Sequence, residues 1–128
     1  MKLLLDTHAL VWALADPDRL SLRARHALAD SRSVLFASVT SAWELAILQG
    51  LGRLHMGVPL ESVFTANLAA MGIRLLPIQL AHLTCLGTLP QLHRDPFDRM
   101  IIAAAMSEGL SIVSRDRAFA QYDVPVVW

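Results

Sequence analysis

The feature that most constrains this chain is the alternation of short apolar runs with longer segments of helical periodicity. Four runs, at 3–5, 34–37, 73–76 and 111–114, read as strands, and 124–127 is a possible fifth. Strands that alternate with helices pair in parallel, and helices must then cover both faces of the sheet. The sequence therefore predicts an α/β fold of three layers, α/β/α, with a central, mostly parallel sheet of four to five strands.

Helix start and stop signals lie between these strands. Ser21 is placed to cap one helix, while Gly72 and Gly109 are placed to end two others. Pro96 after Asp95 marks the first turn of the last long helix. The expected helices begin at Thr7 and at 38–41, and otherwise span 22–29, 59–71, 79–86 (the weakest) and 96–108.

Length and composition favour a single globular domain. A chain of 128 residues supports one domain with a core, and a hydrophobic content of 55% against 17% charged excludes disorder. The chain has 11 Lys and Arg residues and 11 Asp and Glu residues, so its formal net charge is zero. Any contact with nucleic acid must therefore depend on a local group of basic residues rather than on overall positive charge. The apolar excess also predicts a surface for an oligomer or a bound peptide.

The cysteine count and hydropathy indicate a cytoplasmic protein. Cys85 is the only cysteine, so no disulfide can form within the chain, and a cysteine-based zinc site is excluded. Asp6 and His8 interrupt the apolar N-terminus before it could serve as a signal-peptide core. No apolar run approaches the roughly 20 residues of a spanning helix, so we expect no membrane association.

Two distant acids are predicted to meet at one edge of the sheet. Asp6 and Asp116 each lie just beyond the end of a strand, and ligands of parallel sheets gather outside the carboxyl ends of the strands. Clustered carboxylates raise one another's pKa unless a cation neutralises them. Oxygen ligands favour Mg²⁺ or Mn²⁺, either of which could activate water for phosphodiester hydrolysis.

Four blocks of sequence resemble the PIN-domain family, and in particular the VapC-like toxin ribonucleases of type II toxin–antitoxin systems. They are Leu3-Leu4-Leu5-Asp6-Thr7-His8, Trp43-Glu44-Leu45-Ala46, His93-Arg94-Asp95-Pro96-Phe97-Asp98-Arg99 and Ser114-Arg115-Asp116. The third block, followed by an Ile-Ile-Ala helix, is the most specific. The resemblance spans nearly the whole chain and implies a single PIN domain over 1–128.

The resemblance implies an endoribonuclease that depends on Mg²⁺ or Mn²⁺. The residues that match the family's metal-binding, catalytic acids are Asp6, Glu44, Asp98 and Asp116. The resemblance also implies the toxin of a toxin–antitoxin pair, with RNA as substrate, a cognate antitoxin as partner and a homodimeric state.

Each acid also has a structural interpretation. Asp6 and Asp116 could cap the helices that follow them, and Ser41-x-x-Glu44 matches a capping box. Asp95 is placed to cap the helix from Pro96, so we assign it the structural task. Asp98, the third helical residue, matches the ligand because the family's third acid directly precedes an apolar helix.

Neighbouring polar residues are candidates for supporting roles. Thr7 and Ser114 could orient a carboxylate or cap the backbone, and Asp95 could bind metal through water. Arg99 and Arg115 are candidates for RNA contact, with Arg94 and Arg117 near them in sequence. The histidines next to these acids, His8 and His93, are expected to be structural, and Trp12 and Trp43 to lie in the core.

Two other functions stay open at this point. The chain could be a catalytically idle PIN module that only binds a partner, although its acid set is intact. It could also be a metal-dependent phosphohydrolase with Asp6 as nucleophile, although such enzymes need a second aspartate where this chain has His8. Leu48 stands where the PIN subgroup commonly has a lysine, which could weaken RNA binding if that lysine contacts the substrate. Ala104 stands where glutamine is frequent, and neither difference affects a predicted ligand.

Overall fold

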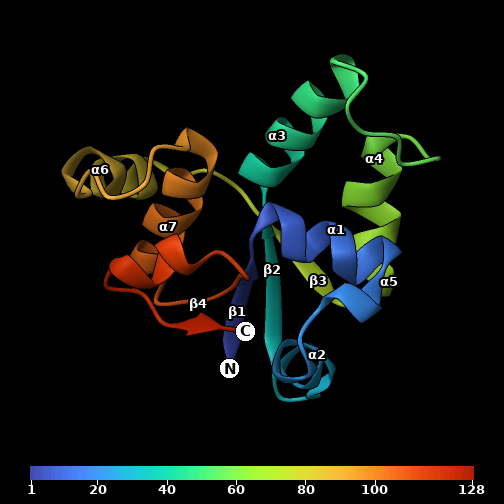
Figure 1. Ribbon diagram of the computed structural model, residues 1–128, viewed down its shortest axis with the longest axis horizontal. Coiled ribbons are helices and arrows are strands. Elements are labelled where there is room, and N and C mark those ends of the chain that lie inside the picture. Colours follow the sequence, from blue (N-terminus) through green and yellow to red (C-terminus); the bar gives the residue numbers. More distant parts are fainter.

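Five parallel strands form the centre of the molecule (Figure 1). The structure is a computed structural model that describes residues 1–128. The strands lie in the order β3-β2-β1-β4-β5, so the α/β prediction and the possible fifth strand are both confirmed. Their bounds are β1 (Lys2–Leu5), β2 (Val34–Ser38), β3 (Ile73–Leu76), β4 (Ser111–Val113) and β5 (Val126–Val127).

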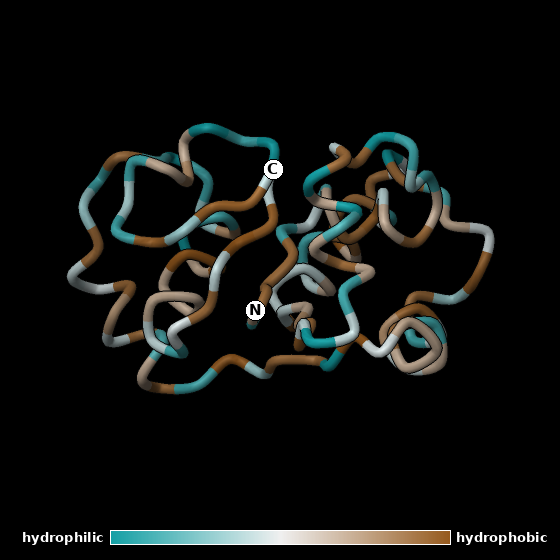
Figure 2. Tube along the Cα trace, turned by 90° about the horizontal axis from the view of Figure 1, so that it is seen from below, coloured by the Kyte–Doolittle hydropathy of each residue, from teal (hydrophilic) through white to brown (hydrophobic).

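Helices cover both faces of the sheet, as expected for parallel strands. Side chains alternate along β1, so Leu3 and Leu5 join one apolar core while Leu4 joins the other. The first core packs under α1 (Thr7–Ala15), α2 (Leu22–Ala29) and the helical segment 60–70. The second packs under α6 (Leu80–Thr88) and α7 (Pro96–Glu108). Figure 2 shows hydrophobic and hydrophilic stretches alternating along the Cα trace.

The helices differ from the predicted ones in detail. The helix expected over 59–71 consists of α4 (Leu60–Ser62), a π-helical stretch, η2 (Val63–Asn67), and α5 (Leu68–Ala70). Two short 3₁₀ helices, η1 (Pro17–Arg19) and η3 (Arg117–Gln121), lie in turns, and α3 (Val39–Gly50) follows β2 directly. None of the helices is long and apolar enough to cross a membrane.

The topology brings the ends of β1 and β4 and the N-terminus of α7 to the carboxyl edge of the sheet. Leu5 of β1 is paired with Val113 of β4, so the residues that follow them, Asp6 and Ser114, are neighbours at this edge. The chain turns from α7 into β4 at Gly109, whose φ of 68° suits glycine and ends the helix in the left-handed conformation. Because α7 runs antiparallel to β4, its N-terminus also lies at the carboxyl edge.

We predict that truncating Ile102, a fully buried residue of the second core, lowers the stability of the protein. Ile102→Ala should lower the free energy of unfolding by about 2–5 kcal/mol, because it removes apolar contacts and leaves a cavity. Leu51→Ala is the matched control, since Leu51 is 64% exposed and its loss should change stability by less than about 0.5 kcal/mol. Urea denaturation measures both, and equal effects would contradict the assignment of this core.

Candidate metal-binding active site

Asp6 both caps α1 and lies buried at the centre of the site. Its Oδ1 accepts a hydrogen bond from the Ala9 N–H at 2.7 Å, and its Oδ2 accepts one from the Ser114 hydroxyl at 2.5 Å. Burial raises the pKa of Asp6, although these hydrogen bonds act in the opposite direction. Each oxygen keeps a lone pair, so the capping role and a ligand role are compatible.

Asp98 is the acid on which the others converge. Its side chain is only 18% exposed, and its pKa is raised to about 8. Burial is the main cause, followed by repulsion from Asp95, Asp6, Glu44 and Asp116, in that order. The structure therefore brings the other three predicted ligands, Asp6, Glu44 and Asp116, within electrostatic reach of Asp98, from segments far apart in the sequence.

His93 bridges two of these acids, a role that sequence reasoning missed. Its Nε2 lies 3.1 Å from Asp98 Oδ2 and 3.2 Å from Asp116 Oδ2. Its Nδ1 accepts the Asp95 N–H at 3.1 Å, so the proton of the neutral ring is on Nε2. His93, Asp98 and Asp116 offer ligand atoms within 4.8 Å of one another, a compact set that does not include Asp6 or Glu44. The only signal in the sequence was the position of His93, two residues before the helix cap Asp95.

Glu44 is free of the capping role that the sequence allowed. Helix α3 begins at Val39 with Ser38 as its cap, so Ser41 lies inside the helix and the proposed capping box is wrong. One carboxylate oxygen of Glu44 is buried with no hydrogen-bond partner. A buried acceptor without a partner is costly, so this oxygen needs a donor or a cation.

These groups fit a divalent cation. The donor set is carboxylate oxygen, the repulsion that contributes to the raised pKa of Asp98 would be relieved by positive charge, and Glu44 Oε1 lacks any other partner. Without such an ion the cluster is an unfavourable arrangement that the fold nevertheless maintains.

Two acids also fix the local backbone. Asp95 Oδ1 accepts the N–H groups of Phe97 and Asp98, which is the capping task that the sequence predicted. Asp116 Oδ1 accepts the Ala118 N–H at 2.9 Å and so caps η3. Ser114 Oγ accepts the Asp116 N–H while donating to Asp6, and it links the ends of β4 and β1.

Two of the supporting candidates lie elsewhere than expected. Arg99 is buried, and its guanidinium donates to the carbonyls of Leu89 and Pro90 and to the Tyr122 hydroxyl, so it holds the loop before α7 rather than facing RNA. Thr7 pairs with the Ser41 hydroxyl at 2.9 Å, not with a carboxylate. Both differences have the same cause: a buried polar group needs a hydrogen-bond partner, and Arg99 and Thr7 find theirs within the protein.

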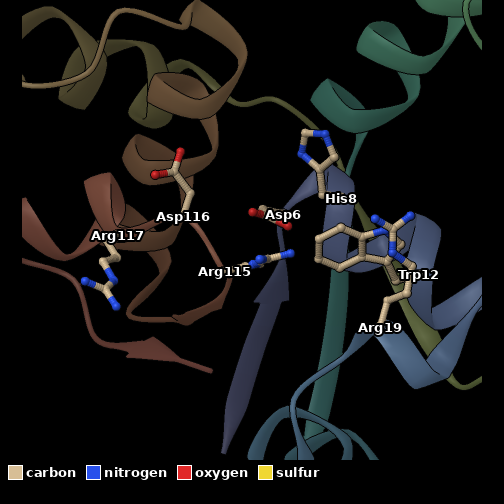
Figure 3. Close-up of a pocket in the computed structure, with 7 residues that line it drawn as sticks. All are labelled: Asp6, His8, Trp12, Arg19, Arg115, Asp116 and Arg117. Atoms are coloured by element: carbon tan, nitrogen blue, oxygen red, sulfur yellow. The ribbon is translucent and has the colours of Figure 1, made fainter.

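An open pocket of about 570 Å³ adjoins the acids (Figure 3). Asp6 and Asp116 line it together with Arg115, the RNA-contact candidate that the structure leaves exposed. Trp12 is half-buried in its wall, and Trp43 is 57% exposed with its ring 4.8 Å from that of Phe97. The expectation that both tryptophans belong to the core is therefore wrong for Trp43 and only partly met for Trp12.

The comparisons with known proteins agree with this architecture. The model of the PIN domain matches residues 3–125, so the chain belongs to the PIN-domain family. Ribonuclease VapC22 of Mycobacterium tuberculosis is 31% identical over 98% of this chain and 97% of its own.

Solved structures share the fold at lower identity. A chain of VapBC2 from Rickettsia felis, bound to a DNA fragment from its promoter, matches with a TM-score of 0.68 and 18% identity over 98% of this chain and 97% of its own. FitAcB from Neisseria gonorrhoeae matches with a TM-score of 0.64 and 23% identity over 97% of this chain and 95% of its own.

We predict that the metal-free protein loses stability as pH rises. The folded-state pKa of Asp98, about 8, lies above its unfolded value near 4, so between these values the folded state binds the extra proton. The free energy of unfolding should then fall by up to about 1.4 kcal/mol per pH unit, with the decline ending above pH 8. Asp98→Asn, which carries no charge, should remove this part of the slope and melt higher than wild type at neutral pH. Thermal melts in chelator from pH 5 to 9 measure both, and parallel curves for the two proteins would contradict the raised pKa.

Proposed function

We propose that the chain is an endoribonuclease that hydrolyses RNA phosphodiester bonds with the help of Mg²⁺ or Mn²⁺. The observation that carries the proposal is the convergence of acids on Asp98, whose pKa of about 8 marks a site that needs a cation. The likeness to a protein named as a ribonuclease, over nearly the full length of both chains, supports the same activity.

Asp6, Glu44, Asp98 and Asp116 would hold the ion, and the hard oxygen ligands favour Mg²⁺ or Mn²⁺ over softer metals. When bound, the ion supplies charge to stabilise the phosphate oxygens and lowers the pKa of water. The unpartnered oxygen of Glu44 is the most available donor, because it gives up no hydrogen bond on binding.

The chain's other residues hold this machinery in place. The Ser114 hydroxyl fixes the orientation of Asp6, and Asp95 fixes the first turn of α7 from which Asp98 projects. His93 donates its Nε2 proton to Asp116, and its Nε2 also lies 3.1 Å from Asp98 Oδ2, so the ring offsets part of the repulsion between these acids. Arg115, exposed in the same pocket, supplies positive charge for the RNA backbone.

The same proposal includes a biological context, the toxin of a toxin–antitoxin pair in the cytoplasm. A cognate antitoxin would bind the toxin, and an apolar pocket of about 150 Å³ lined by residues such as Val11, Leu54 and Met56 supports an apolar partner segment. A homodimer is supported by exposed apolar side chains that include Leu80 and Leu83.

We predict cleavage of labelled single-stranded or structured RNA by the purified protein in Mg²⁺ or Mn²⁺, and none in chelator. Asp98→Asn keeps the shape of the side chain but removes its charge, so it should lower the rate by at least about 100-fold. Asp123→Asn is the matched control, because Asp123 is an exposed acid outside the site, and its rate should equal that of wild type.

Other results would favour the alternatives. Metal binding by calorimetry without cleavage of any RNA would support an idle binding module. A phosphoenzyme formed on Asp6 would support the phosphohydrolase. Equal RNA cleavage by wild type and Asp98→Asn would indicate a contaminating nuclease and remove the basis of the proposal.

A further inference from the structure

An aromatic and cationic cluster forms the wall of the pocket opposite Asp116 (Figure 3). The Arg19 guanidinium carbon lies 5.0 Å from the centre of the Trp12 ring (Figure 3). The Trp128 ring lies 5.8 Å from the Trp12 ring, and the His8 ring 5.9 Å from it. Trp12 is thus held from several sides while its pocket-lining surface stays accessible.

The arginines of this pocket make no ion pair within the chain. Arg25 and Arg32 bond to aspartates, whereas the side chains of Arg19, Arg115 and Arg117 have neither a salt bridge nor a hydrogen bond, although Asp6 and Asp116 line the same pocket. In a protein with no net charge this is a local concentration of positive charge. Such unpaired guanidinium groups suit an exogenous anion, above all a phosphate.

The pocket therefore combines three kinds of group in one open volume. It has acids for a cation, arginines for phosphate, and the Arg19 guanidinium positioned over the Trp12 ring. Single-stranded RNA is recognised by stacking of its unpaired bases on aromatic rings or on arginine planes. Bases in a duplex have both faces covered and cannot use such a surface.

We propose that Trp12 and Arg19 form a stacking subsite for one unpaired nucleobase of RNA, next to the phosphate held near Asp6 and Asp116. This inference rests on the proposed ribonuclease function and adds to it the residues that would contact a base of the RNA. Arg19 has two separable tasks in it, since its plane stacks on the base and its charge attracts the backbone. Trp12 contributes a stacking surface and carries no charge of its own.

The test measures binding in an Asp98→Asn background, with a fluorescent single-stranded RNA of random sequence and the same RNA as a duplex. Fluorescence anisotropy across a range of salt gives both the affinity and its salt dependence. Trp12→Leu should weaken binding of the single strand about tenfold without changing the salt slope, because it removes stacking only. Arg19→Ala should weaken binding and also flatten the slope by about 0.7, the contribution of one phosphate contact.

Arg19→Lys separates the plane of Arg19 from its charge. It keeps the positive charge and therefore the salt slope, but should lose several-fold in affinity because an ammonium group cannot stack. Since Arg19 is exposed, this variant should fold even if Trp12→Leu does not. Arg23→Ala is the matched control, because Arg23 is exposed on α2, away from the pocket, and it should bind as the background protein does.

Wild-type cleavage, measured separately, distinguishes the two proposals. If the variants at Trp12 and Arg19 bind and cut single-stranded RNA as well as their parents do, the subsite is overturned while the nuclease stands. If the protein binds single strands through Trp12 and Arg19 but cuts no RNA, the nuclease fails while the subsite stands. Equal affinity for single strand and duplex, or no binding of either, also overturns the subsite.

Discussion

Mutual repulsion among carboxylates at the carboxyl edge of the sheet is the constraint on which the rest of this structure depends. Asp98 shows it most clearly, because burial and four neighbouring acids raise its pKa to about 8. The apolar cores on both faces of the sheet offset this unfavourable arrangement. Two local interactions limit it further: the Ser114 hydroxyl donates to Asp6, and the His93 ring donates to Asp116 while lying 3.1 Å from Asp98.

The fold explains why these groups meet. Parallel pairing of β1 with β4 sets the ends of both strands side by side, and the antiparallel return of α7 brings its N-terminus to the same edge. Asp6 and Asp116 cap the helices that follow their strands, so the hydrogen bonds that organise the backbone also aim the carboxylates. Helix capping and the proposed metal binding are therefore complementary uses of the same residues rather than competing ones.

Most of the fold could be predicted from the sequence, because hydrophobic periodicity and the residues that form turns and helix ends are local features. The strands, the last helix and its Asp95 cap follow from apolar runs, proline and glycine. It failed where the outcome depends on packing between distant segments. Arg99 was predicted to contact RNA, but its guanidinium donates to the carbonyls of residues 89 and 90. His93 was expected to be structural, and its contact with Asp98 and Asp116 depends on the folding of distant segments. Trp43 lies in an apolar helix, yet the face it occupies is left uncovered by the rest of the chain.

The most direct test of the central claim is a titration of the Asp98 side-chain carboxyl by carbon-13 NMR in chelator and again in Mg²⁺. The account predicts a carboxyl that titrates near pH 8 in the metal-free protein, is absent from Asp98→Asn, and shifts to much lower pH when Mg²⁺ is added. A carboxyl that titrates near pH 4 in both conditions would contradict the account, because Asp98 would then experience neither the repulsion nor the cation on which the proposed site depends.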